Sequence, residues 1–193
     1  IESLPSASTF TFDTTNPTAV STYPATGGYV LAIDRLAGSA TDYPAIGGAG
    51  TGNAGLSLVE IQLQDTSNNY YWNGSTWIAT VPASTPTATG QAAWSYGIST
   101  NAWVSGNTYR IKVRAKDNAG NVPAFPAGNT FSVDANRPMS RVGVPAPNGY
   151  YNSMAAISGT ASDVTSPIQT VQVSLTSGPV LGQNWWNGTT WVG

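Results

Sequence analysis

The chain has 193 residues, of which 8% are charged, and its formal net charge is −2. It contains no Cys and no His, which excludes disulfides, thiolate chemistry, the commonest general base and the commonest transition-metal ligand. No basic run is present to bind nucleic acid or an anionic membrane, and no segment reaches the roughly 20 apolar residues of a membrane helix.

One module occurs twice in the chain. The segment TFTFDTTNPTAVSTYPATGGY (9–29) reappears as TFSVDANRPMSRVGVPAPNGY (130–150) at an offset of 121, and GSATD ending at Asp42 returns as GTASD ending at Asp163. The offset is 112 where VEIQ meets VQVS and 114 where YWNGSTW (71–77) meets WWNGTTW (185–191). Self-similarity at a nearly fixed period is typical of tandem arrays.

Alternating apolar and polar residues predict short strands and no long helix. In chain order, the strands of the first copy are expected near Ser21 and over 36–40, 59–64, 93–98, 109–116 and 129–133. Val171, Val173 and Leu175 repeat the pattern of 59–64 in the second copy. The two Asn-Gly pairs, at 73–74 and 187–188, predict hairpin tips of type I′, in which both central residues have positive φ.

The repeat divides the chain into three parts. Residues 1–13 match 122–134 and are expected to be the last strand of a preceding repeat, 14–134 a complete domain, and 135–193 the N-terminal part of a second repeat. A neighbouring chain that donated residues 1–13 to the truncated copy would restore one of about three missing strands. We therefore favour a slice of a longer array over completion by an identical subunit.

Four motifs carry a resemblance to a known family. They are D-T-T-x-P with its counterpart D-x-N-x-P, G-[ST]-A-[ST]-D, W-N-G-[ST]-T-W, and the run from Trp103 to the D-N-A-G-N that ends at Asn121. They resemble the bacterial Ig-like, fibronectin type III-like repeats of large surface or secreted proteins. The resemblance implies an all-β fold of tandem immunoglobulin-like antiparallel β-sandwiches, one complete and one truncated, with Tyr109 as a tyrosine corner and no catalytic residues.

In such a sandwich, the incoming strand and two of the loops lie at one end. This would gather the oxygen-bearing side chains of Asp13, Asn16, Asp42, Asp117, Asn118 and Asn121 at the junction with the preceding domain. Calcium prefers six to eight oxygen ligands, so a junctional Ca²⁺ is one interpretation. The other is that no cofactor binds and these residues serve turns, where Asp and Asn accept local backbone hydrogen bonds.

The aromatic hairpins also allow two interpretations. Exposed rings could stack on glycans, and the candidate ligand-binding residues are Tyr71, Trp72, Trp77, Trp185, Trp186 and Trp191. Alternatively, the rings cover the edge of the core, where Trp and Tyr bury a large area. The basic stripe Arg110, Lys112, Arg114 and Lys116 is interpreted as a solvated strand face opposite Glu60.

No Ser-His-Asp set, phosphate loop or zinc pattern is present, so we expect no enzyme activity. The sequence favours a non-catalytic structural repeat of a large extracellular or cell-surface protein, such as a stalk, an adhesin or a filament or surface-layer component. Its partners would be neighbouring repeats or identical subunits. The alternative is a carbohydrate-binding accessory module that uses the Trp and Tyr hairpins to bind surface glycans.

Overall fold

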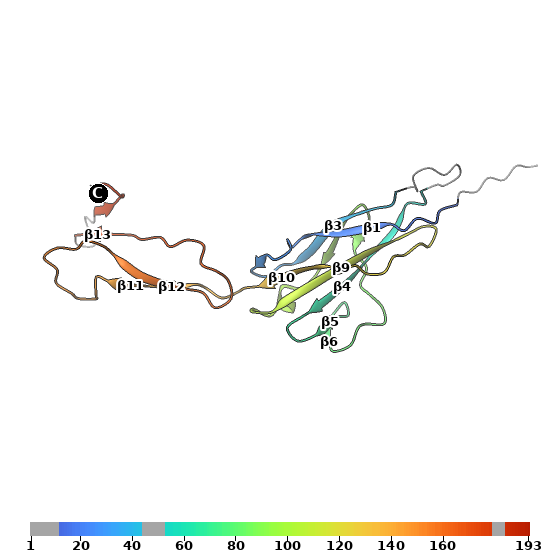
Figure 1. Ribbon diagram of the computed structural model, residues 1–193, viewed down its shortest axis with the longest axis horizontal. Coiled ribbons are helices and arrows are strands. Elements are labelled where there is room, and N and C mark those ends of the chain that lie inside the picture. The colour runs from blue at the N-terminus through green and yellow to red at the C-terminus, as the bar shows by residue number, and fades with distance from the viewer. Residues whose placement is uncertain (1–11, 44–52, 179–183) are drawn as a thin grey trace, which may run out of the picture. The chain divides into compact units, whose positions relative to one another are not determined.

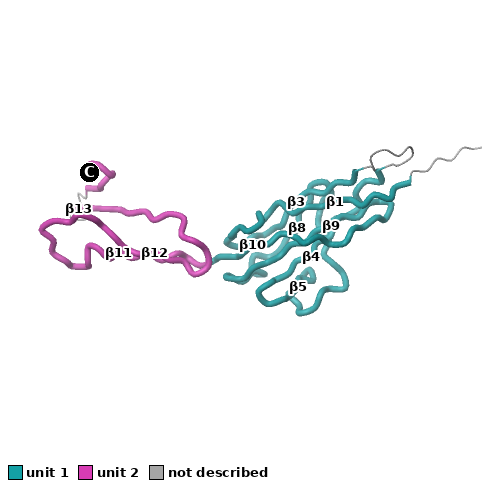
Figure 2. The backbone as a smooth tube through the Cα atoms, in the orientation of Figure 1, with its two compact units in different colours: residues 1–135 teal, residues 136–193 magenta. Residues whose placement is uncertain are grey.

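The computed structural model describes residues 12–43, 53–178 and 184–193. The chain forms two compact units, residues 1–135 and 136–193 (Figure 2). The protein is all-β, as expected, with several antiparallel sheets (Figure 1). Over the described ranges, the helical structure is a single 3₁₀ turn, Thr100–Ala102. None of the described residues belongs to an apolar helix of membrane-spanning length.

The first unit contains two sheets. The four-stranded sheet has the order β1 (Thr18–Tyr23), β3 (Arg35–Thr41), β8 (Ala93–Gly97), β7 (Thr89–Gly90). The six-stranded sheet has the order β2 (Tyr29–Val30), β10 (Asn129–Val133), β9 (Thr108–Asp117), β4 (Leu56–Asp65), β5 (Tyr70–Trp72), β6 (Trp77–Ile78). All pairings are antiparallel except β2 with β10. The expected strands of the first copy are confirmed, whereas the two-residue strands β2 and β7 are too short to leave a periodic pattern.

The core is built on the long pair β4 and β9. Val59, Ile61 and Leu63 alternate inward on β4, opposite Ala115, Val113 and Ile111 of β9, and all six are buried. Leu36 and Trp94 from the four-stranded sheet belong to the same buried cluster, so the two sheets share one core. On the outer face, Arg114 pairs with Glu60 at 2.6 Å, which confirms the expected partner of the basic stripe.

The hairpin tips form as expected, but their turn type is different. Asn73 and Thr76 close a four-residue loop through an amide-to-carbonyl hydrogen bond of 3.1 Å, and of the pair Asn73-Gly74 only the glycine has positive φ. Asn73 Oδ1 instead accepts the amides of Ser75 and Thr76, both at 2.9 Å. The Asn side chain therefore replaces a backbone acceptor, a role that the type I′ prediction overlooked.

The second unit repeats the local structure of the first. It contains β11 (Met139–Val144) paired with β12 (Ser158–Ser162), and a sheet of β13 (Thr176–Ser177), β14 (Asn184–Trp186) and β15 (Trp191–Val192). Thr18 pairs with Thr41 and Met139 pairs with Ser162, so the register is the same after a shift of 121. No strand forms over 171–175, where one was expected. The equivalent strand of the first unit, β4, pairs with β9 along its length, whereas no described strand pairs with 171–175.

Gly38 lies on β3 between the buried residues Leu36 and Ala40, on the face of the strand that points toward the core. A Cβ built on it would collide with the carbonyl oxygen of Val20 and the ring of Trp94, and one built on the equivalent Gly159 would collide with the carbonyl oxygen of Arg141. A side chain at position 38 would thus require both a backbone and a core ring to shift.

We predict that Gly38→Ala lowers the free energy of unfolding by about 1–3 kcal/mol, the usual cost of overpacking a tight core. Gly97→Ala is the matched control, because a Cβ there meets nothing within 4 Å. Urea unfolding of the full chain, followed by circular dichroism, measures both variants; equal losses for the two would contradict the packing described here.

Tyr109 anchors an aromatic cluster in the same core. Its ring lies 4.8 Å from that of Trp103 and 5.6 Å from that of Phe131 (centroid distances), and its hydroxyl accepts the Val104 amide at 2.8 Å. Burial raises the pKa of the Tyr109 phenol above 10.0; the Val104 hydrogen bond opposes this shift, and the charge of Asp65 adds to it.

A raised folded-state pKa means that folding stabilises the neutral phenol. This contribution is complete below the unfolded-state pKa of about 10 and is lost as pH rises through the folded value. We expect the stability of the native chain to fall more steeply above pH 10 than that of Tyr109→Phe. At neutral pH that variant should lose about 1–3 kcal/mol, because the Val104 amide has no acceptor. Parallel pH profiles for the two proteins would rule out this role of the phenol.

Candidate metal centre

Strand register brings three aspartates to one end of the first unit. Thr18, at the start of β1, pairs with Thr41, at the end of β3, so Asp13 and Asp42 approach from the same side. Asp117 is the last residue of β9 and pairs with Leu56 at the start of β4. The chain therefore delivers one carboxylate from each of three segments that are far apart in sequence.

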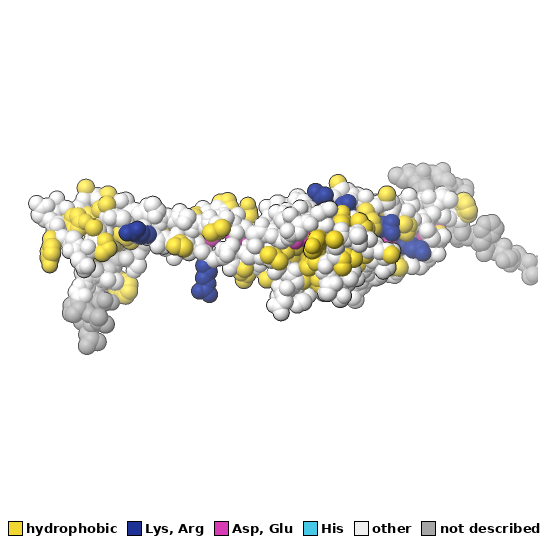
Figure 3. All heavy atoms as spheres, turned by 90° about the horizontal axis from the view of Figure 1, so that it is seen from below, with side chains coloured by type: hydrophobic (Ala, Val, Ile, Leu, Met, Phe, Trp, Pro, Cys, Tyr) yellow, Lys and Arg dark blue, Asp and Glu magenta, His cyan; other side chains and the backbone are white. Residues whose placement is uncertain are grey.

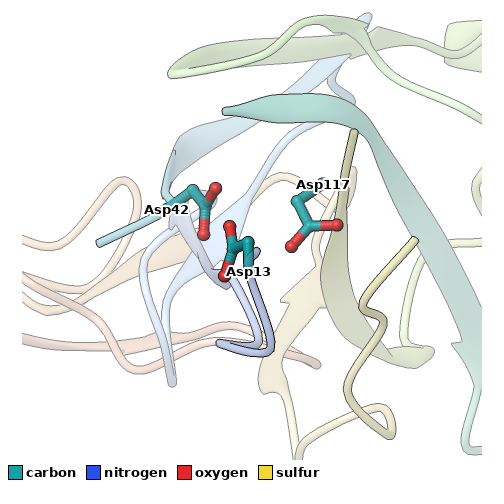
Figure 4. Close-up of side chains that lie close together, drawn as sticks. All are labelled: Asp13, Asp42 and Asp117. Carbon is teal, nitrogen blue, oxygen red and sulfur yellow. The ribbon is translucent and has the colours of Figure 1, made fainter. Parts of the chain in front are cut away.

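The three carboxylates form a compact, buried group. One oxygen from each lies within 4.8 Å of the others, and the side chains point toward one another (Figure 4). The exposed fractions are 9% for Asp13, 8% for Asp42 and 1% for Asp117. Buried carboxylates this close are unusual, since Asp is almost never fully buried unless it is paired.

Backbone amides satisfy most of the carboxylate oxygens. Asp13 accepts the amides of Thr15 at 2.9 Å and Ala54 at 2.7 Å. Asp117 Oδ1 accepts the amides of Gly120 and Asn121, both at 2.7 Å, and its Oδ2 accepts Asn121 Nδ2 at 2.7 Å. These bonds fix the orientation of both side chains.

Asp42 is only partly satisfied. Its Oδ2 accepts the Gly55 amide at 2.9 Å, whereas its buried Oδ1 has no hydrogen-bond partner among the described residues. A buried carboxylate oxygen without a partner bears a desolvation cost that is not compensated. This atom is the exception in a group that is otherwise well hydrogen-bonded.

The pKa values of Asp42 and Asp117 shift in opposite directions. Burial raises the pKa of Asp42, the negative charges of Asp13 and Asp117 raise it further, and the Gly55 hydrogen bond opposes the shift. Burial also acts to raise the pKa of Asp117, but the hydrogen bonds from Asn121, Gly120 and Ala119 outweigh it and lower the pKa. The hydrogen bonds thus favour the charged form of Asp117, whereas the surroundings of Asp42 disfavour its charged form.

Among the described residues, no Lys or Arg forms a salt bridge with these three carboxylates, and the Arg114–Glu60 pair lies on the strand face. The stretches 1–11, 44–52 and 179–183, outside the described residues, contain no Lys or Arg in the sequence. The chemistry of this site is therefore that of hard, anionic oxygen ligands.

The predicted asparagines lie at different places around the group. Asn121 is part of it, since its Nδ2 also donates to the Asp13 carbonyl at 3.1 Å. Asn118 lies beside it and donates from Nδ2 to the Ala54 carbonyl at 2.9 Å, while Asn16 is exposed and lies outside the buried group. The segment 53–55 also contributes to the site and was not predicted: Asn53 donates to the Asp42 carbonyl, and Gly55 has a φ of +74°. The glycine-rich stretch 47–55, which precedes the strand β4, was the feature of the sequence that could have indicated this segment.

The aromatic hairpin of the first unit packs on the core. Trp72 is 7% exposed, and its indole N–H donates to the Tyr96 hydroxyl at 2.9 Å. Trp77 is half-buried and donates to the Ala102 carbonyl at 2.7 Å, and half-buried Tyr71 accepts Gln64 Nε2 at 3.1 Å. Core packing thus accounts for Trp72 and Trp77, whereas Tyr71 lies beside Gln64 on the outward face of the sheet.

The corresponding rings of the second unit, Trp185, Trp186 and Trp191, are exposed. The planes of Trp186 and Trp191 are inclined by 61°, close to the 63° between Trp72 and Trp77. This pair does not form the flat platform that stacking on a hexose favours. Glycan binding by these residues stays a prediction.

Comparisons with protein-family models and with curated protein sequences gave no match for this chain.

We predict that Trp72→Ala lowers the free energy of unfolding by about 3–5 kcal/mol, as expected when a buried aromatic side chain is removed. Tyr70→Ala, on the same strand with 44% exposure, is the control and should cost far less. Calorimetry of the full chain distinguishes the two. A Trp72 variant as stable as the Tyr70 variant would mean that this ring is free for another role.

Proposed function

We propose that this chain is a non-catalytic structural part of a large extracellular surface protein, built from Ig-like sandwich repeats as a stalk, adhesin, or filament or surface-layer component. The resemblance to bacterial Ig-like repeats in the D-N-A-G-N and W-N-G-[ST]-T-W motifs supports it. So does the single core that the two sheets of the first unit share.

The observation that carries the proposal is the repeated strand register. Every pair between β1 and β3 has its counterpart between β11 and β12 at a shift of 121. Even the irregularity recurs, after Ser21 in the first unit and after Val142 in the second. Repetition at this level of detail is expected of units that serve the same mechanical purpose in an array, whose stability is a sum over similar neighbours.

The small number of charged side chains on the surface agrees with a role as a spacer between other parts of the protein. Figure 3 shows few charged side chains on the face that it displays, where hydrophobic side chains gather in groups on each unit. Among the described residues, the acidic groups that come together are the buried aspartates, which have no His or Cys beside them to act as base or nucleophile. These features favour a structural role over catalysis.

The proposal predicts surface exposure in the cells that make this protein. Antibodies raised against the 193-residue chain should label intact cells, and protease treatment of intact cells should remove the signal. The reacting polypeptide should have a denatured mass several times 20.0 kDa. An antibody against a cytoplasmic protein is the control, because it should label only permeabilised cells.

Labelling confined to permeabilised cells would contradict the proposal. A saturable, glycan-dependent rise in the melting temperature of the chain would favour the carbohydrate-binding alternative instead.

A further inference from the structure

We propose that Asp13, Asp42 and Asp117 bind one calcium ion at the end of the first unit. The site is built from the start of β1, the end of β3 and the end of β9, so the ion would join both sheets. This inference rests on the geometry of the first unit alone and does not depend on the function proposed above.

One buried carboxylate oxygen at this site has no hydrogen-bond partner among the described residues. Asp42 is more than nine-tenths buried, its Oδ2 is held by the Gly55 amide, and its Oδ1 has no donor among the described residues. Figure 4 shows the Asp42 carboxylate directed toward Asp13 and Asp117. A turn-forming aspartate uses its oxygens on local amides, as Asp117 does with Gly120 and Asn121. A role in turns therefore leaves Asp42 Oδ1 unexplained, and a cation accounts for it.

The negative charge of the three carboxylates is not compensated by a basic side chain among the described residues. Three carboxylates whose oxygens lie within 4.8 Å repel one another strongly where water is excluded. The described residues place no Lys or Arg against them, and the remaining segments contain neither residue. A bound divalent cation supplies the missing positive charge at the point where the three side chains converge.

The donor set favours calcium over other metals. All three ligands are hard carboxylate oxygens, and the chain has no His or Cys with which to select zinc or copper. Calcium accepts about six to eight oxygens in flexible geometry, so water and backbone carbonyls can complete its shell. Magnesium demands near-ideal octahedral geometry and usually keeps several waters, which suits this group of fixed, buried carboxylates less well.

The amide hydrogen bonds hold the ligands in place before the ion arrives. The Ala54 amide fixes Asp13, the Gly55 amide fixes Asp42, and the segment after β9 fixes Asp117. Asn121 ties the Asp13 carbonyl to the Asp117 carboxylate. Ion binding would therefore stabilise the attachment of residues 12–16 to the sheets without a large rearrangement.

The test is thermal unfolding of the full chain, first stripped with chelator and then titrated with CaCl₂. Millimolar Ca²⁺ should raise the Tm by about 5 °C or more, and isothermal titration should give one site per chain. Asp34→Asn, which changes an exposed carboxylate outside the cluster, should show the full shift. Asp42→Asn should show none, yet in chelator it should melt at or above the native Tm, because it relieves the repulsion.

Three outcomes would overturn the proposal: a native chain that Ca²⁺ neither stabilises nor binds, an Asp42→Asn variant that keeps the shift, or an equal shift with Mg²⁺ at the same concentration. Asp13→Asn provides a second ligand variant should Asp42→Asn fail to fold. A calorimetric titration of the native chain that shows no Ca²⁺ binding would overturn the proposal without any variant.

Discussion

The antiparallel pairing of β4 with β9 is the interaction on which the first unit depends. It runs from Leu56 opposite Asp117 to Asp65 opposite Tyr109, and it sets the inward face of both strands. A shift of one residue would turn the apolar side chains outward and the Arg and Lys side chains inward, so the register is strongly specified. The same register places Tyr109 at one end of the core and Asp117 at the other.

The aspartate group lies where this packing stops. Buried apolar side chains stabilise the interior of the unit, but at its end three carboxylates occupy buried positions instead of hydrophobic side chains. Removing such charges from water is costly, and hydrogen bonds from the backbone offset only part of the cost. Binding of a ligand explains why three carboxylates are buried together, whereas packing alone does not.

Much of the first unit could be predicted from the sequence, because β4 and β9 alternate strictly between apolar and polar residues. The resemblance to Ig-like sandwiches also predicted that Asp13, Asp42 and Asp117 would share one end. The strands β2 and β7 could not be predicted, because two residues show no period. The partners of Asp42 and the turn made by Asn73 escaped prediction because they depend on tertiary contacts and on side-chain hydrogen bonds, which periodicity does not encode. The prediction of a strand over 171–175 was wrong, because an alternating segment forms a β-strand only when a neighbouring strand pairs with it.

The most direct test of the calcium site is a crystal structure of the chain grown with CaCl₂. We expect an ion between the three side chains, with one oxygen each of Asp13, Asp42 and Asp117 at about 2.3–2.6 Å and with Asp42 Oδ1 among its ligands. A well-ordered structure in which Asp42 Oδ1 instead bonds to a water or to a neighbouring carboxyl proton, with no ion between the three side chains, would contradict it.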